Sequence, residues 1–194
     1  MRSGQLLFVI LFIIAITVFS FLRERKKKPH VLFIGDPFQN KASLITQMQK
    51  IAGYAFDFSW ENIQNTDGKV YFESVEKGIQ KIDPKAIFIY FDFSISILSD
   101  GEYQPLNLIP FENFCRQNAL SMQEKRILLV IIFQRSKVNH FEMIAKILAE
   151  FDLPFINLDE VLEPQNTYES SNLLSPIEIE KLASKASQFL DRIS

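Results

Sequence analysis

Short runs of apolar residues, separated by longer amphipathic stretches, recur from residue 30 to the end of the chain. Apolar runs of four to eight residues are typical of buried strands, whereas apolar residues spaced three and four apart indicate helices. The pattern predicts strands at 31–34, 54–60, 86–93, 126–133 and 153–158. It predicts helices at 37–52, 70–82, 111–123, 141–151 and 176–193, with Phe114 and Leu120 facing inward. Repeated strand–helix units predict a three-layer α/β/α sandwich around a five-stranded, mainly parallel sheet.

The first and last helices of this domain carry the clearest capping signals. After the strand VLFI, Asp36 is predicted to cap a helix whose first residue is Pro37 and whose stop is Gly53. Residues 175–178, SPIE, have the form of a capping box. Ligands of open α/β sheets bind where strands end and helices begin, so a site is expected around Asp36 and Pro37.

An uncharged apolar run of 18 residues, 5–22, precedes the domain. A helix of that length covers about 27 Å at about 1.5 Å per residue, close to the ~30 Å hydrocarbon core of a bilayer. A cleaved signal peptide would have a shorter apolar segment and a small-residue cleavage site, which does not follow this run. We therefore expect a tail at 1–4, a transmembrane anchor at 5–22, a basic linker at 23–29 and the α/β domain at 30–194.

The linker carries five cationic side chains between residues 23 and 28, more positive charge than precedes the span. The positive-inside rule then favours a cytoplasmic domain, although Arg2 and the amino terminus leave the opposite orientation open. The same cations predict attraction to anionic headgroups, so membrane lipid is the expected partner of residues 5–28.

The net charge of −2 conceals an asymmetry between the two parts of the chain. Residues 1–29 hold six of the 21 Lys and Arg residues and one of the 23 acidic residues, which leaves 30–194 with a net charge of −7. An acidic domain repels phosphate backbones, so no nucleic-acid partner is expected. A single cysteine, Cys115, excludes an intramolecular disulfide. His30 and His140 are too far apart for a local zinc motif, and the scattered glycines form no nucleotide-binding loop, so neither metal nor cofactor is expected.

Three blocks, in succession, resemble those of the SGNH, or GDSL-type, hydrolase family over nearly all of residues 30–194. VLFIGDP resembles the first block, an apolar strand ending in Gly-Asp-Ser. KIDPKAIFIYFDF resembles the segment that leads to the oxyanion-hole asparagine, and LLSPIEIEKLAS resembles the closing segment, where an Asp-x-x-His motif precedes a helix. The resemblance implies a flavodoxin-like, SGNH-hydrolase-like fold. It also implies the activities of this family, whose members are esterases, lipases and carbohydrate acetyl-esterases.

The residues that carry the family's chemistry are replaced in this chain. In the family a serine attacks the acyl carbon, a histidine takes its proton, and N–H groups hold the oxyanion. Pro37 occupies the position of the serine and has neither a hydroxyl nor an N–H. The asparagine block corresponds to about 91–94 and offers Asp92, and the Asp-x-x-His positions fall near Ser170 and Leu173. The resemblance therefore implies a degenerate site at Asp36, Pro37, Asp92, Ser170 and Leu173.

Two functions follow from this comparison. The first is a catalytically inactive domain that binds a protein partner or an acyl or glycan ligand at the membrane. The alternative is an active esterase or carbohydrate O-deacetylase that uses other residues, such as Ser43 or Ser94, with a displaced base. His30, at the entry to the first strand, is expected at the opposite end of the sheet. A different flavodoxin-like sheet, with the first strand at its edge or without the closing helix, is a third interpretation.

Overall fold

The computed structural model describes residues 12–14, 16–17, 28–35, 39–63, 68–91, 96–97, 103–104, 108–134, 141–162 and 173–193. The strands are β1 (His30–Ile34), β2 (Asp57–Glu61), β3 (Ala86–Tyr90), β4 (Ser96–Ile97), β5 (Tyr103–Gln104), β6 (Leu128–Phe133) and β7 (Phe155–Asn157). The α-helices are α2 (Lys41–Ile51), α3 (Gly68–Ile82), α4 (Leu108–Glu124), α5 (Phe141–Glu150) and α6 (Pro176–Leu190).

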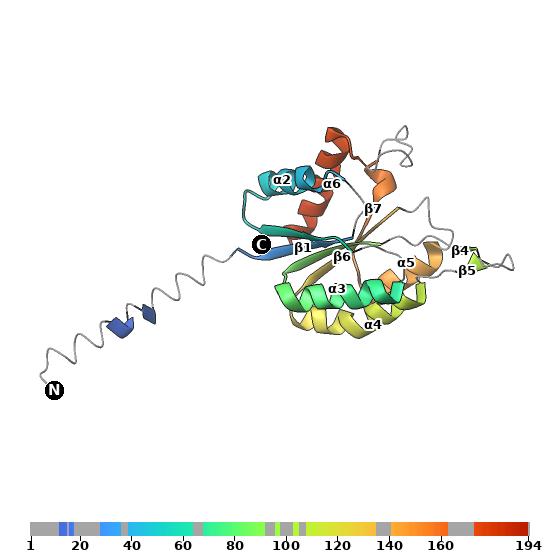
Figure 1. Ribbon diagram of the computed structural model, residues 1–194, viewed down its shortest axis with the longest axis horizontal. Coiled ribbons are helices and arrows are strands. Elements are labelled where there is room, and N and C mark those ends of the chain that lie inside the picture. The colour runs from blue at the N-terminus through green and yellow to red at the C-terminus, as the bar shows by residue number, and fades with distance from the viewer. Residues whose placement is uncertain are drawn as a thin grey trace, which may run out of the picture.

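Five strands form one parallel sheet in the order β2-β1-β3-β6-β7. The two short strands β4 and β5 pair antiparallel as a separate hairpin. This arrangement confirms the five-stranded parallel sheet expected from the apolar runs. It also argues against the third interpretation, because β1 lies inside the sheet and α6 closes the domain (Figure 1).

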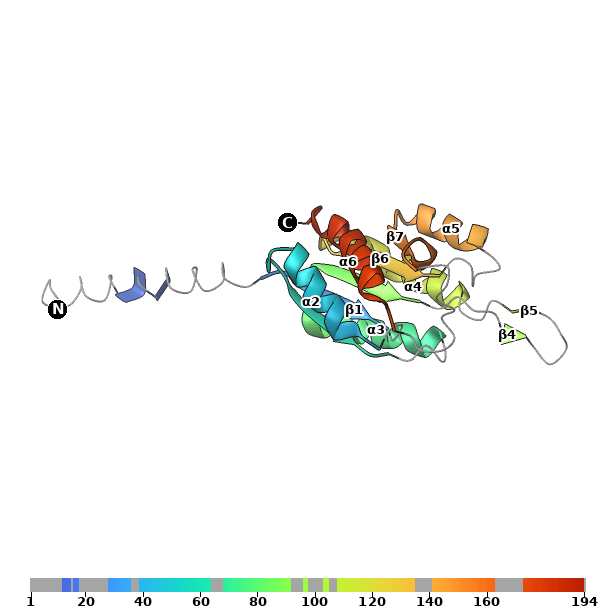
Figure 2. The same ribbon diagram turned by 90° about the horizontal axis from the view of Figure 1, so that it is seen from above.

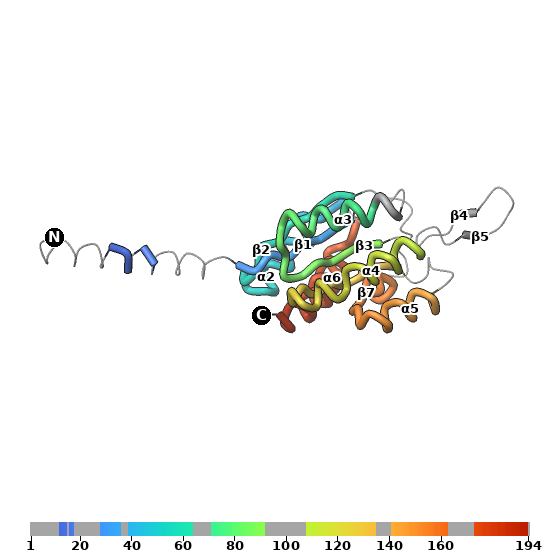
Figure 3. Tube along the Cα trace, turned by 90° about the horizontal axis from the view of Figure 1, so that it is seen from below, coloured from blue at the N-terminus to red at the C-terminus, as the bar shows by residue number. Residues whose placement is uncertain are grey.

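Helices cover both faces of the sheet. Helices α2 and α6 lie side by side on one face (Figure 2), and α3, α4 and α5 lie on the other (Figure 3). Each face has its own buried core, because alternate residues of the central strands point to opposite sides. Leu32 and Ile34 pack toward α3, α4 and α5, whereas Val31 and Phe33 pack toward α2 and α6.

Phenylalanine rings fill much of the core beneath α3 and α4. The ring of Phe72 lies 4.7 Å, between centroids, from both Phe91 and Phe114, and Phe111 lies 5.8 Å from Phe91. All four side chains are buried. Large aromatic rings supply much apolar area per residue, so these four phenylalanines contribute strongly to this core.

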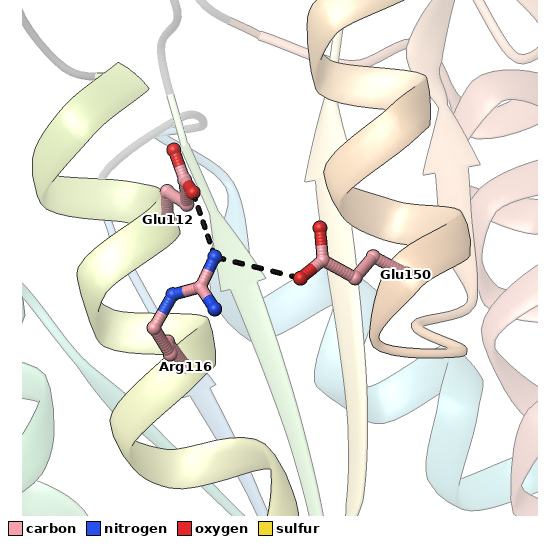
Figure 4. Close-up of polar contacts among 3 residues, drawn as sticks. All are labelled: Glu112, Arg116 and Glu150. Atoms are coloured by element: carbon pink, nitrogen blue, oxygen red, sulfur yellow. Dashed lines mark hydrogen bonds and ion pairs between the residues drawn. The ribbon is translucent and has the colours of Figure 1, made fainter.

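Arg116 connects α4 with α5 at the surface. Its guanidinium donates to Glu112 at 2.9 Å and to Glu150 at 3.4 Å (Figure 4). The hydrogen bond to Glu112 and the charge of Glu150 raise the pKa of Arg116. The guanidinium also lies 5.7 Å from the ring centre of Phe151. All three ionic side chains are exposed, so this bridge orients the two helices more than it stabilises them.

The ends of several elements differ from the predictions. Helix α2 begins at Lys41 with Asn40 as its N-cap residue, so the predicted start at Asp36 and Pro37 is wrong. Strand β2 begins at Asp57 rather than at Tyr54, because Tyr54 belongs to the turn that follows α2: its N–H donates to the Gln49 carbonyl at 2.8 Å.

Helix α4 corrects two further expectations. It begins at Leu108, so Pro110 lies in its first turn, where a missing N–H costs no helical hydrogen bond. Phe114 is buried as expected, but Leu120 is 71% exposed and does not face the core. Only the Leu120 prediction was out of phase, by one residue, because the buried positions of this helix are Leu108, Phe111, Phe114, Cys115, Ala119 and Met122.

The capping box of the last helix is confirmed. The Ser175 hydroxyl accepts from the Glu178 N–H at 3.3 Å, and the Glu178 carboxylate accepts from the Ser175 N–H at 2.7 Å. Among the described residues no helix is long and apolar enough to cross a bilayer. The run 5–22 lies mostly outside those residues.

Candidate functional site

The carboxyl ends of the parallel strands meet at one edge of the sheet, and Gly35 lies there, directly after β1. Its backbone has a φ of +111°, which side chains rarely tolerate. The Gly35 N–H donates to the Glu61 carbonyl at 3.0 Å, and the indole of Trp60 donates to the Gly35 carbonyl at 2.6 Å. The N–H and the carbonyl of Gly35 are therefore both hydrogen-bonded to residues of β2.

Gly35 also lies close to the end of β3. The hydroxyl of Tyr71, from α3, donates to the Tyr90 carbonyl at 2.6 Å. A Cβ atom on Gly35 would lie 2.9 Å from that same carbonyl oxygen and 3.3 Å from the Tyr71 hydroxyl. Burial, and then the neighbouring Tyr90, raise the pKa of Tyr71, so its phenol stays a neutral donor. The end of β1 is thus held from both sides immediately before Asp36.

The first and closing blocks of the domain meet through Asn40. Its amide Nδ2 donates to the Leu174 carbonyl at 2.8 Å, and the Leu174 N–H donates to Asn40 Oδ1 at 3.2 Å. Leu174 is buried, whereas Leu173 is 50% exposed. Of this closing segment the structure describes Leu173 and Leu174, and Leu174 lies against the start of α2.

Most of the predicted site residues fall outside the described part of the chain. Asp36, Pro37, Asp92 and Ser170 belong to this group, and of the five only Leu173 is described. The alternative nucleophile Ser94 and the histidine His140 also lie outside it. Near the expected site the structure describes Gly35, which is hydrogen-bonded to β2, and the separate contact between Asn40 and Leu174.

Ser43 lies in the first turn of α2 and is exposed, which is shallower than the two turns expected from a helix that starts at Pro37. It lines a surface pocket of about 580 Å³ between α2 and α6, together with Ala42, Thr46, Gln47, Lys50, Pro176, Ile179 and Glu180. No imidazole is among these residues, so the pocket offers Ser43 no histidine as a base.

The structure does contain a hydroxyl–imidazole pair, but at the other end of the sheet. His30 Nε2 and Ser59 Oγ are 2.8 Å apart, across the pairing of β1 with β2. This position confirms that His30 lies at the entry to the first strand, away from the expected site. Sequence reasoning missed the pair because it depends on the strand register. That register pairs His30 with Asp57, so Ser59 lies two residues further along β2, and neither strand alone reveals it.

One further pocket flanks the expected site. It has about 490 Å³ and lies between the first halves of α3 and α4, lined by Phe72, Glu73, Glu76, Ile109, Pro110, Asn113, Phe114 and Gln117. Glu76 accepts a hydrogen bond from Asn118 at 2.8 Å. In the described ranges no group of three His, Cys, Asp or Glu side chains could hold a metal ion.

No protein-family model matches the chain, and no curated protein matches its sequence. Solved structures do match its fold. A catalytic mutant of an acetylxylan esterase from Geobacillus stearothermophilus superposes with a TM-score of 0.61 at 10% identity, over 84% of this chain and 94% of that chain. The esterase EstA from Pseudoalteromonas sp. gives 0.58 at 10% identity, over 84% and 100%.

A third structure carries the name of the motif that the first block resembles. It is a Desulfitobacterium hafniense protein assigned to the G-D-S-L family of lipolytic proteins, with a TM-score of 0.60 at 12% identity, over 84% of this chain and 99% of that chain. At these identities the likeness establishes the fold.

Proposed function

We propose that this chain, which has the fold of the SGNH/GDSL-type hydrolases, is a membrane-anchored domain that binds its ligand without hydrolysing it. Pro37 carries this proposal, because the likeness of VLFIGDP to the first block of those hydrolases aligns it with the attacking serine. A proline has no hydroxyl to attack an acyl carbon and no N–H to stabilise an oxyanion. Loss of a nucleophile and its base lowers hydrolysis by several orders of magnitude.

The closing segment supports the same conclusion. Residues 169–174 read ESSNLL and contain no histidine. Both backbone groups of Leu174 are hydrogen-bonded to Asn40, so this residue is held beside α2 by structural contacts.

The anchor is supported by composition and by exposed apolar side chains. Phe12, Ile13, Ile14 and Ile16 are helical and each at least 50% exposed. Apolar side chains in water are unfavourable, whereas a bilayer would cover them. The basic linker favours a domain on the cytoplasmic side. An export-dependent reporter enzyme fused to the C-terminus should stay inactive, and activity of that reporter would reverse the orientation.

The ligand class is inferred from two of the solved structures that share the fold, the acetylxylan esterase and the esterase EstA. We infer that the degenerate site binds an acylated or glycan ligand, or a protein that presents one. The competing function is a working esterase or O-deacetylase that uses Ser43 or Ser94.

A fluorophosphonate probe, which reacts with activated serines, separates these functions in the full-length protein held in detergent micelles. We expect no covalent labelling and no turnover of a simple acetyl ester, with an acetylxylan esterase as the positive control. Labelling that disappears in Ser43→Ala or Ser94→Ala, with the variant still folded, would establish the hydrolase and overturn the binding function.

A further inference from the structure

A pocket of about 760 Å³ opens at the amino edge of the sheet, the edge opposite to the expected site. It is formed where the linker enters β1, where β2 begins and where α3 turns into β3. Its lining residues are Lys28, Pro29, His30, Asp57, Ile82, Asp83 and Lys85. We call it the amino-edge pocket.

The charged side chains of this pocket are unusual in having both signs and no protein partners. Lys28 and Lys85 are cationic, Asp57 and Asp83 are anionic, and all four are exposed. Within the described ranges none of the four makes an ion pair or a side-chain hydrogen bond. Two cations and two anions left unpaired in one cavity suit a ligand that itself carries both charges.

The floor of the pocket is held in place by the sheet. The Lys85 N–H donates to the His30 carbonyl at 2.8 Å, and the Asp57 N–H donates to the Pro29 carbonyl at 3.0 Å. The His30 ring is fixed through its Nε2, which lies 2.8 Å from the Ser59 hydroxyl. The backbone that carries the charges is therefore ordered before any ligand arrives, which lowers the entropic cost of binding.

We propose that the amino-edge pocket binds the zwitterionic headgroup of a membrane phospholipid with a primary amine, as in phosphatidylethanolamine. Lys28 and Lys85 would face the phosphate, and Asp57 and Asp83 would accept hydrogen bonds from the ammonium. A quaternary ammonium, as in phosphatidylcholine, has no N–H to donate, and phosphatidylglycerol has no ammonium at all.

The position of the pocket in the chain identifies the membrane as the source of the headgroup, and this step rests on the anchor proposed above. Only residues 23–29 separate the apolar run from β1, and seven residues span at most about 25 Å. Exposed charges bind weakly on their own. A short tether compensates, because it keeps the pocket at a high effective concentration of headgroups.

The test uses the full-length protein in nanodiscs of phosphatidylcholine alone, or of phosphatidylcholine mixed with either phosphatidylethanolamine or phosphatidylglycerol. Native mass spectrometry of the released protein counts the retained lipids. We expect phosphatidylethanolamine to be retained about tenfold over either competitor. The double variant Asp83→Asn, Lys85→Gln should lose that preference.

The matched control is Lys125→Gln, Asp152→Asn, which makes the same charge changes at the same edge but outside the pocket. It should keep the preference. Equal retention of phosphatidylethanolamine and phosphatidylcholine by the unaltered protein, or stronger retention of phosphatidylglycerol, would overturn the proposal without any variant. Extraction of membranes with alkaline carbonate tests the anchor separately: release of the protein would refute the anchor, whereas an anchored protein without lipid preference would refute only the pocket.

Discussion

Asn40 and Leu174 lie 134 residues apart in the chain and exchange two hydrogen bonds. The side-chain Nδ2 of Asn40 donates to the Leu174 carbonyl, and the Leu174 N–H donates to the side-chain Oδ1 of Asn40. One side chain thus satisfies both polar groups of one distant peptide residue. Asn40 makes no side-chain capping bond to α2, although it occupies the N-cap position. Its amide is committed to joining the start of α2 to the segment before α6.

We predict that Asn40→Ala destabilises the domain by about 1–3 kcal/mol, because it leaves a donor and an acceptor of the buried Leu174 without their partner. Urea unfolding measures the loss, and hydrogen exchange should show faster exchange of the Leu174 amide. Ser43→Ala, on an exposed position of the same helix, should change stability by less than about 0.5 kcal/mol. An unchanged exchange rate at Leu174 in Asn40→Ala would contradict the assigned contact.

Gly35 and Gly78 provide a matched pair for testing the rigid turn. Gly35→Ala combines a φ of +111° with a Cβ only 2.9 Å from the Tyr90 carbonyl oxygen, so we expect a loss of more than about 2 kcal/mol. Gly78, within α3, has nothing within 4 Å of an added Cβ. Gly78→Ala should therefore stabilise the domain by about 0.5–1 kcal/mol. Thermal melts of both variants check the contrast, and similar effects of the two substitutions would refute it.

Cys115 predicts how stability changes at alkaline pH. Burial, and then the charge of Glu112, raise the pKa of this thiol from 9.0 to about 12 in the folded protein. Above pH 9 the unfolded chain loses the proton while the folded chain keeps it, so stability falls as pH rises toward 12. The contribution is up to about 1.4 kcal/mol per pH unit.

Cys115→Ala should remove that contribution from the slope of unfolding free energy against pH, whatever its effect on stability at neutral pH. Denaturant unfolding at several values between pH 8 and 11 measures the slope. Equal slopes for the two proteins would show that the thiol ionises as readily in the folded as in the unfolded state. The same burial predicts that iodoacetamide alkylates Cys115 only after unfolding.

The apolar run Val31–Ile34 and the SPIE signal were sufficient to predict a central buried strand and the start of the last helix, because both depend on neighbouring residues alone. Element ends were less predictable. Asp36 and Pro37 satisfy the local rules for a helix start, yet the α-helix begins at Lys41, where Asn40 is held by Leu174. A contact between residues 134 positions apart does not change the hydrophobic periodicity around Asn40, so the local sequence does not reveal it.

The sequence by itself determined the α/β class, the number of sheet strands and the proline at position 37, since composition, periodicity and residue identity are local properties. The tertiary structure alone decided what meets at each edge of the sheet. Strand register joined His30 to Ser59 and gathered unpaired lysines and aspartates from three separate segments into one pocket. The connections between strands determine which strands are neighbours in the sheet. The residues of one strand do not show which distant strand pairs with it.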